Sequence, residues 1–270
     1  MKNRYPLYLL SDSSGNLLEH FLGAILTQFP KEKFDVQTLS FLKDEEKLRK
    51  ALESIREGIV FHGLISPRLK ALAASECVKR KLPCWDVTGP TADFLQKVTD
   101  VPPSLTPKPL HSFDINYQKR VDALEFSMQH DDSRRLEDLE KADIILVGIS
   151  RVSKSPNALF LAYRGFRVAN VSIIPSQELP EPLVRHVRKN VAALTLQPVQ
   201  LAEIRKRRFS QWKLNQFEYE DLPKIIDEVS EAEKIYREKG WPVIDTTGLA
   251  IEETSALILS ALNLRPKVFE

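Results

Sequence analysis

The sequence predicts an α/β protein: an N-terminal doubly wound parallel α/β domain followed by a C-terminal α/β domain that contains a P-loop. Short apolar or alternating runs, typical of strands, alternate with amphipathic stretches typical of helices. At 270 residues the chain is longer than a typical single domain. Four prolines in residues 101–109 interrupt the alternation, and we place the domain linker there.

The N-terminal domain, residues 1–105, is expected to be Rossmann-like. Four strand–helix pairs fill about a hundred residues, which favours a parallel sheet with helical crossovers. The expected strands are Tyr5–Leu10, Phe34–Phe41, Ile59–Phe61 and Pro83–Val87. The expected helices are Leu17–Phe29, Glu45–Arg56, Pro67–Lys81 and Thr91–Val98.

The C-terminal domain, residues 106–270, repeats this alternation and is expected to be kinase-like. Its expected strands are Ile144–Val147, Arg167–Ile174, Val191–Leu196 and Trp241–Asp245. Its expected helices are Tyr117–Gln129, Asn157–Tyr163, Leu201–Phe209, Asp221–Lys239 and Ile251–Leu262.

Composition argues against several classes of protein. The net charge of +2 provides no bulk attraction to nucleic acid or to a membrane. The basic run Arg205–Arg208 is interpreted as a solvated helix face, because it lacks interleaved aromatic residues. Cys77 and Cys84 are too few for a disulfide framework or a zinc cluster. Without a signal peptide or a membrane-spanning run, the protein is expected to be cytoplasmic.

The most informative motif follows the strand Ile144–Val147. A tight turn with the pattern Gly-x-x-x-x-Ser-Lys-Ser leads into a helix, which is the layout of a phosphate-binding loop. Backbone N–H groups would face the anion, Lys154 would add a charge, and Ser155 could ligate Mg²⁺. The alternative is an ordinary turn with a chance Lys-Ser pair. The expected nucleotide-binding residues are Gly148, Ile149, Ser150, Arg151, Val152, Ser153, Lys154 and Ser155.

A second polar cluster follows the first strand of the chain. Its hydroxyl and N–H groups could hold a second phosphate or a phosphorylated side chain. Simple N-capping of the next helix would explain the same residues. The residues concerned are Ser11, Asp12, Ser13 and Ser14.

Acidic residues give two further candidates. His130, Asp131 and Asp132 follow a predicted helix, and the acids could bind Mg²⁺ or accept a hydroxyl proton during phosphoryl transfer. A solvated turn, with His130 as a helix C-terminal residue, is the alternative. Asp245, at the end of a strand, is a second metal candidate beside Ser155, although a turn would also explain it.

These motifs together resemble the regulatory proteins of pyruvate, phosphate dikinase and of phosphoenolpyruvate synthase, a family of bifunctional protein kinase–phosphorylases. The resemblance covers nearly the whole chain in order, and the Ser153-Lys154 variant is closer to the dikinase branch. The matching segments are Ser11–Ser13, Arg120–Asp122, His130–Asp132, Gly148–Pro156, Leu161–Asn170, Trp241–Asp245 and Ile251–Thr254.

The resemblance implies an unusual pair of reactions. Such proteins phosphorylate a threonine of the dikinase with ADP as donor, and they remove that phosphate with inorganic phosphate, forming pyrophosphate. It implies dikinase or synthase as protein substrate and Arg120 as a phosphate- or substrate-binding residue, while Mg²⁺ is expected as a cofactor from the loop hydroxyl and the acids. We expect the catalytic residues to be His130, Asp131, Asp132 and Lys154. A homo-oligomer is also expected; the sequence leaves its size open.

The chain departs from the family pattern at several positions. Asn157-Ala158 stands where Thr-Ser is usual, Ser133 where Gly is usual, and Gly248–Ala250 where Arg and Ser are common. Ser14 and Leu17 replace threonines. Two other functions therefore stay open: a small-molecule P-loop kinase, and a nucleotide sensor that binds the dikinase without modifying it.

Overall fold

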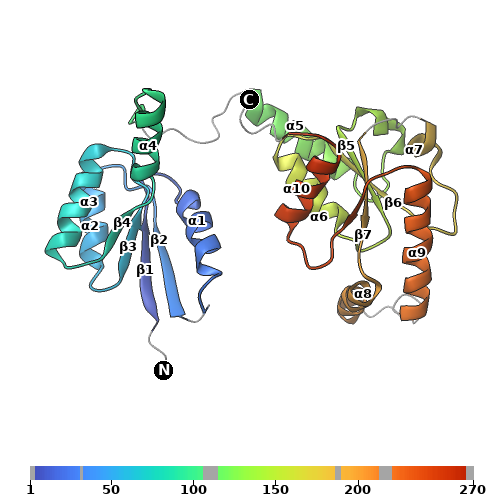
Figure 1. The fold of residues 1–270 in the computed structure, drawn as a ribbon, viewed down its shortest axis with the longest axis horizontal. Coiled ribbons are helices and arrows are strands. Elements are labelled where there is room, and N and C mark those ends of the chain that lie inside the picture. The colour runs from blue at the N-terminus through green and yellow to red at the C-terminus, as the bar shows by residue number, and fades with distance from the viewer. Residues whose placement is uncertain (1–3, 31–32, 106–114, 186–189, 213–220, 266–270) are drawn as a thin grey trace. The chain divides into compact units, whose positions relative to one another are not determined.

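The computed structural model describes residues 4–30, 33–105, 115–185, 190–212 and 221–265. The chain divides into two compact units, Met1–Ser112 and Phe113–Glu270, and each has its own four-stranded parallel sheet (Figure 1). The predicted α/β class is confirmed. The predicted boundary after residue 105 borders a segment, 106–114, that lies outside the described residues. In the part of the chain that is described, no helix is both long enough and apolar enough to cross a membrane.

The N-terminal sheet has the strand order β2-β1-β3-β4, with β1 at the point where the chain reverses its direction of winding. Because side chains alternate along a strand, Leu9 and Leu10 of β1 face opposite layers. Leu9 packs with helix α1, whereas Leu10 joins the cluster under α2 and α3. Figure 1 shows α1 on one face of this sheet and α2 and α3 on the other. The elements are β1 Tyr5–Leu10, α1 Asn16–Leu26, β2 Phe34–Leu39, α2 Glu45–Ser54, β3 Ile59–His62, α3 Pro67–Lys79, β4 Cys84–Asp86 and α4 Gly89–Thr99.

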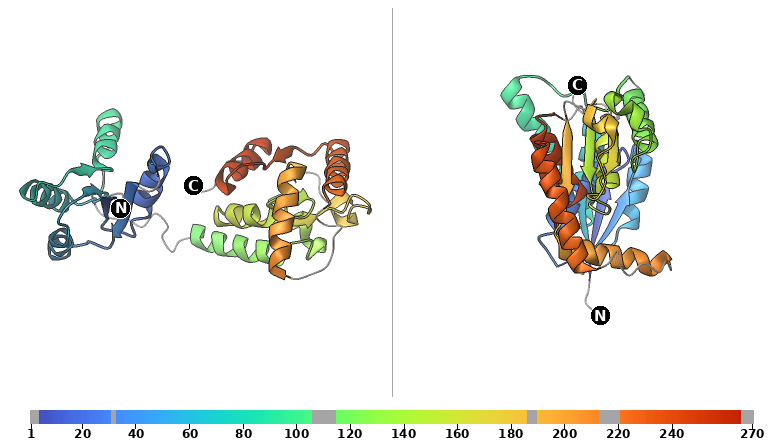
Figure 2. Two further views of the ribbon diagram at one scale, coloured as in Figure 1. Left: turned by 90° about the horizontal axis from the view of Figure 1, so that it is seen from below. Right: turned by 90° about the vertical axis from the view of Figure 1, so that its right-hand side faces the viewer.

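The C-terminal sheet has the order β6-β5-β7-β8, which repeats the N-terminal order strand for strand. Helices cover both of its faces (Figure 2): α6 contacts α5 and α10, while α9 contacts β7 and β8. The strands are β5 Ile144–Gly148, β6 Val168–Ser172, β7 Val191–Thr195 and β8 Val243–Asp245. The helices are α5 Ile115–Gln129, the 3₁₀ helix η2 Leu136–Lys141, α6 Lys154–Tyr163, α7 Glu181–Arg185, α8 Pro198–Trp212, α9 Leu222–Glu238 and α10 Ile251–Ala261.

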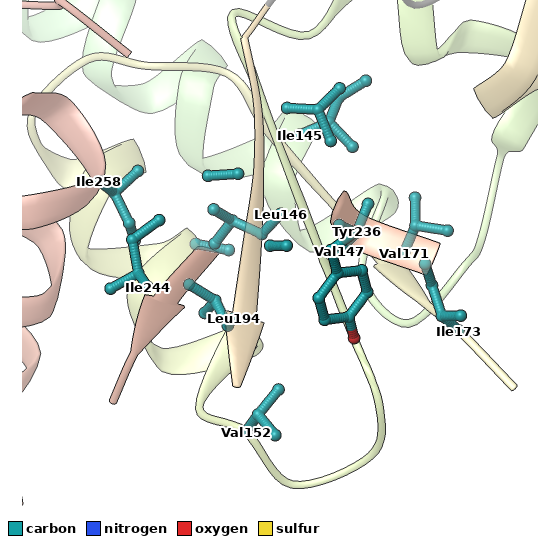
Figure 3. Packing of buried hydrophobic residues seen from close by; sticks show 14 of the residues in the cluster. Ile145, Leu146, Val147, Val152, Val171, Ile173, Leu194, Tyr236, Ile244 and Ile258 are labelled. Atoms are coloured by element: carbon teal, nitrogen blue, oxygen red, sulfur yellow. The ribbon is translucent and has the colours of Figure 1, made fainter. Parts of the chain in front are cut away.

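The core of this domain is built on β5, which is buried along its whole length. Figure 3 shows Leu146 on the side of Ile258 from α10, and Val147 on the side of Tyr236 from α9. The apolar run that predicted a strand therefore reflects helices on both faces of a parallel sheet. Burial of this kind contributes about 1.5–3 kcal/mol for each large aliphatic side chain.

Two differences from the predicted elements have simple causes. Helix α6 begins at Lys154 rather than Asn157, because Pro156 falls in the first turn, where backbone N–H groups have no intrahelical partner. Helices η2 and α7 were not predicted from the sequence. Each is six residues or shorter, too short to show a helical period.

Candidate active site

The loop between β5 and α6, residues 149–153, lies at the carboxyl end of the sheet and next to the reversal point, where open α/β sheets bind ligands. Ile149 and Val152 are buried and anchor the loop to the core. Arg151 and Ser153 have left-handed backbones, with φ of 77° and 64°, so the chain turns sharply into α6. We call this segment the β5–α6 loop.

Gly148 allows the loop to fold back against the sheet. A Cβ atom at this position would lie 2.7 Å from Cγ2 of Val152 and 2.9 Å from the carbonyl oxygen of Leu194 in β7. The second contact is with backbone, which cannot move aside as a flexible side chain can. Glycine is therefore required here by close packing.

Lys154 is the first residue of α6, and only 6% of it is exposed. Its Nζ donates a hydrogen bond to the carbonyl oxygen of Ile149 at 2.7 Å. Burial lowers the pKa of Lys154 to about 8, and the nearby carboxylates of Asp132 and Asp131 partly oppose that shift. The ammonium is thus held in the loop at a large desolvation cost, which an anion in the cleft would reduce.

Asp131 belongs to a three-residue network beside Lys154. Its Oδ1 accepts hydrogen bonds from the Ser155 hydroxyl at 2.8 Å and from the Asn170 amide at 2.5 Å. The Asn170 amide also donates to Ser155 Oγ at 2.9 Å. A carboxylate and a hydroxyl from different elements are therefore fixed side by side.

Asp132 is more exposed than Asp131, and one of its two carboxylate oxygens is fixed by a hydrogen bond. Its Oδ1 accepts a hydrogen bond from the Ser172 hydroxyl at 2.6 Å. The backbone turns through left-handed conformations at Asp132 and Ser133, with φ of 52° and 63°. Ser133 Oγ accepts a hydrogen bond from the Ser172 N–H at 2.8 Å, which ties this turn to the end of β6. Serine thus occupies a position where the backbone favours glycine, and its hydroxyl adds a contact.

These groups line one cleft of about 660 Å³. The predicted residues Asp131, Asp132, Ser150, Arg151, Ser153, Lys154 and Ser155 meet there, together with Pro156, Leu159, Asn170, Ser172 and Ile204. A cleft of this size can hold a nucleotide-sized ligand. Oxygen donors, a buried amine and an accessible carboxylate in one place suit phosphoryl-transfer chemistry.

Six predicted site residues of this domain do not line the cleft. His130 is buried, its ring stacks on Phe126 with centroids 3.8 Å apart, and its Nδ1 lies 2.8 Å from the Phe126 carbonyl oxygen. His130 is not among the residues that line the cleft, and a catalytic role for its imidazole stays a prediction. Arg120 of α5 is not among the residues that line the cleft. Nor are Gly148, Ile149 and Val152, which support the loop from beneath.

Asp245 is the exposed last residue of β8. Its Oδ1 accepts hydrogen bonds from the Thr247 N–H at 2.9 Å and from the Thr247 hydroxyl. It ends β8, which β7 separates from β5, and it is not among the residues that line the cleft. Ser155, the other metal candidate, pairs with Asp131. A metal-binding role for Asp245 stays a prediction. Within the described ranges, no group of three or more His, Cys, Asp or Glu residues is arranged to hold a metal.

In the N-terminal cluster, the side chains of Ser11 and Asp12 accept hydrogen bonds from backbone N–H groups. Ser11 Oγ accepts a hydrogen bond from the Ser13 N–H at 3.1 Å, and the buried Asp12 accepts one from the Ile65 N–H at 2.7 Å. Neither contact caps the next helix: the residue before α1 is Gly15, and no side chain of the described residues caps this helix. Ser14 is exposed. A phosphate-binding role for Ser11, Asp12, Ser13 and Ser14 stays a prediction.

Sequence reasoning missed three contributors to the site. Asn170 and Ser172 lie on β6, where the apolar pattern around them suggested only a buried strand. Polar residues inside such a run were the available signal, because buried polar groups need partners. Arg205 was assigned to a solvated face, yet only 2% of it is exposed, and it binds Glu228 of α9. Its four-residue spacing from buried Leu201 was the missed signal.

Comparison with known proteins places this geometry in a family. The model of the family described as "Kinase/pyrophosphorylase" matches residues 7–259. A protein of Pelagibacter ubique, provisionally named pyruvate, phosphate dikinase regulatory protein, is 34% identical over 264 residues, covering 96% of each chain. An Enterococcus faecalis protein with the same provisional name, numbered 2, is 36% identical over 261 residues, covering 96% of this chain and 95% of its own. A Clostridium perfringens protein so named is 31% identical and covers 96% and 99%. The chain therefore belongs to the kinase/pyrophosphorylase family and is a phosphotransferase.

Proposed function

We propose that this protein transfers the β-phosphoryl group of ADP to a threonine of pyruvate, phosphate dikinase, and removes it again with inorganic phosphate. The observation that supports this most directly is the cleft in which Lys154, Asp131 and Asp132 meet beside the β5–α6 loop. The names of the relatives support the dikinase as partner.

In the kinase direction the threonine oxygen attacks the β-phosphorus of ADP. The bond from that phosphorus to the bridging oxygen breaks, AMP leaves, and the threonine proton passes to a base. We assign the base to Asp132, because its carboxylate is exposed in the cleft and is held at one oxygen by Ser172. General bases of this kind typically contribute about 10²–10⁴-fold in rate.

Lys154 and the loop N–H groups are assigned to the phosphates. The buried ammonium gains a full anionic partner when the nucleotide binds, which offsets its desolvation. Asp131 and Ser155 would hold Mg²⁺, since their oxygen atoms are hard ligands already fixed together. When bound, the metal would neutralise charge on the phosphate oxygens.

In the phosphorylase direction an oxygen of inorganic phosphate attacks the phosphothreonine phosphorus. The bond to the threonine oxygen breaks, that oxygen takes a proton, and pyrophosphate leaves. Because the nucleophile is already anionic, proton abstraction matters less, and positioning and charge neutralisation contribute most of the acceleration. The same cations therefore serve both directions.

The test uses purified protein, purified dikinase and ADP labelled on its β-phosphate. We expect labelled phosphothreonine in the dikinase, identified by mass spectrometry, with release of AMP. Labelling from ATP but not from ADP, or labelling of a small molecule alone, would contradict the proposal. The phosphorylated dikinase is then incubated with inorganic phosphate. Pyrophosphate is expected; free phosphate would show that water is the nucleophile and that the chain is a phosphatase.

A further inference from the structure

Arg205 is a buried cation behind the β5–α6 loop. It lies on α8, only 2% of it is exposed, and it is not among the residues that line the cleft. Its NH1 donates to Glu228 Oε2 at 2.7 Å, and its NH2 donates to Glu228 Oε1 at 3.0 Å. This two-point pairing compensates a charge that is otherwise costly to bury.

The same guanidinium also reaches the loop. NH2 of Arg205 donates a hydrogen bond to the carbonyl oxygen of Ser150 at 3.2 Å. The Ser150–Arg151 peptide is trans, so its carbonyl and its N–H point in opposite directions. Holding the carbonyl against Arg205 therefore turns the Arg151 N–H away from α8. Arg151 itself lines the cleft, so an anion in the cleft can accept a hydrogen bond from the backbone N–H of Arg151.

Two other side chains hold loop carbonyls. Lys154 holds that of Ile149 at 2.7 Å, and Asn157 holds that of Ser153 at 2.8 Å. Lys154 lines the cleft, so its ammonium would also contact a phosphate that enters. Arg205 does not line the cleft, so its contact with Ser150 can persist throughout the reaction.

We propose that Arg205 is a positioning residue, which fixes the β5–α6 loop in its phosphate-accepting shape without touching the nucleotide. This inference rests on the proposed function, because it takes the phosphates of ADP as the ligand of the loop. Glu228 serves to hold the guanidinium in place. Lysine could not replace Arg205, because an ammonium lacks the planar fork that reaches Glu228 and Ser150 together.

The experiment compares Arg205→Lys with Arg207→Lys. Arg207 lies on the same helix, its side chain is 84% exposed, and it forms a surface ion pair with Glu203. ADP and AMP affinities are measured by calorimetry, and folding by circular dichroism. For Arg205→Lys we expect ADP affinity to fall by about 5- to 30-fold, the equivalent of one or two lost hydrogen bonds. AMP affinity should fall less, because the loop holds the β-phosphate; Arg207→Lys should match the unaltered chain.

A second variant separates positioning from stability. Arg205→Met combined with Glu228→Leu removes both charges and leaves no unpaired ion, a replacement that folded proteins often tolerate. It should fold and still show the selective loss of ADP affinity. Unchanged ADP affinity in either folded variant would overturn the inference. So would equal losses for ADP and AMP, or failure of both variants to fold, since each would make Arg205 a residue of general stability. If the unaltered chain binds no ADP, the proposed function fails and the inference with it.

Discussion

The two domains place the same kind of turn at the same point of the same topology, but they equip it differently. Each sheet has its first strand beside the reversal point, and each first strand leads through a turn into a helix. In both turns the residue before the helix has a left-handed backbone: Gly15 with φ of 88°, and Ser153 with φ of 64°. Backbone geometry alone would make both turns candidates for anion binding.

The side chains distinguish them. In the N-terminal turn, Ser11 and Asp12 use their oxygen atoms on neighbouring N–H groups, and the Leu42 N–H donates to the Ser11 carbonyl. In the C-terminal turn, a buried lysine and two carboxylates face a cleft. The comparison shows that a fold supplies positions for a site, whereas the residues placed there decide whether chemistry follows.

The largest expected effect concerns Asp132, the exposed acid that lines the cleft beside the C-terminal turn. Asp132→Asn should reduce threonine phosphorylation by about 10²–10⁴-fold, because the amide cannot accept the hydroxyl proton. Phosphothreonine formation from ADP measures this. Asp138→Asn is the matched control: Asp138 lies on η2, pairs with Lys141, and is not among the residues that line the cleft. If Asp132→Asn phosphorylates threonine at the wild-type rate, the acid pair Asp131–Asp132 has only a structural role in a turn.

The next prediction compares Lys154 and Asn16, the residues that directly follow left-handed Ser153 and Gly15. Lys154→Ala should weaken ADP binding by about 10- to 150-fold, the loss of a charge-assisted contact of about 1.5–3 kcal/mol. Asn16→Ala, at the corresponding N-terminal position, should leave ADP affinity unchanged. Calorimetric titration checks both. Equal losses would mean that both turns bind the nucleotide, and no loss for Lys154→Ala would remove the β5–α6 loop from the site.

Glycine substitutions should separate stability from binding. Gly15→Ala forces a side chain into a left-handed backbone, 2.6 Å from Cγ2 of Thr38, so we expect a loss of about 1–3 kcal/mol in the free energy of unfolding. ADP affinity should not change. Gly148→Ala should lower ADP affinity, because the added Cβ meets backbone of β7 and displaces the loop. Denaturant unfolding and ADP titration of both variants test this. A loss of ADP affinity in Gly15→Ala, with unchanged ADP affinity in Gly148→Ala, would contradict it.

The smallest expected effect is on pH dependence. Burial lowers the pKa of Lys154 to about 8, so the binding form is lost as the pH rises through that value. ADP affinity should therefore fall by at most about tenfold between pH 7 and pH 9. The free energy of unfolding should change in the opposite sense to ADP affinity and rise with pH. From about pH 8 to about pH 10.4 the unfolded chain binds the extra proton, so the contribution of Lys154 to the free energy of unfolding rises with pH.

Lys154→Ala is the control for this pH dependence. Without the lysine, both the fall in ADP affinity and the opposing rise in stability should disappear. Titrations at several pH values, paired with denaturant unfolding at the same values, measure the two trends. An identical pH profile in the variant would assign the titration to another group.

Regular elements were predictable because their causes are local. β1 matches its predicted bounds. β5 differs by one residue, and it was recognisable because a buried strand of a parallel sheet is apolar throughout. The loop and the acid pair were found because glycine, lysine and aspartate have distinctive chemistry. Asn170 and Arg205 were not found, because their partners are distant in sequence: Asp131 is 39 residues away, and Glu228 is 23. Long-range pairings of this kind depend on the order of strands and helices, which no local pattern contains.

The buried hydrogen bond between α6 and α10 has a consequence for synthesis of the chain. The Ser255 hydroxyl donates to Asn157 Oδ1 at 2.9 Å across a separation of 98 residues, and the amide of Asn157 in turn holds the Ser153 carbonyl. Domains fold as units while the ribosome is still adding residues. The N-terminal sheet can therefore form early, whereas the β5–α6 loop receives this support only after α10 has emerged and docked. A nascent or truncated chain that lacks α10 thus lacks one of the contacts that shape the loop.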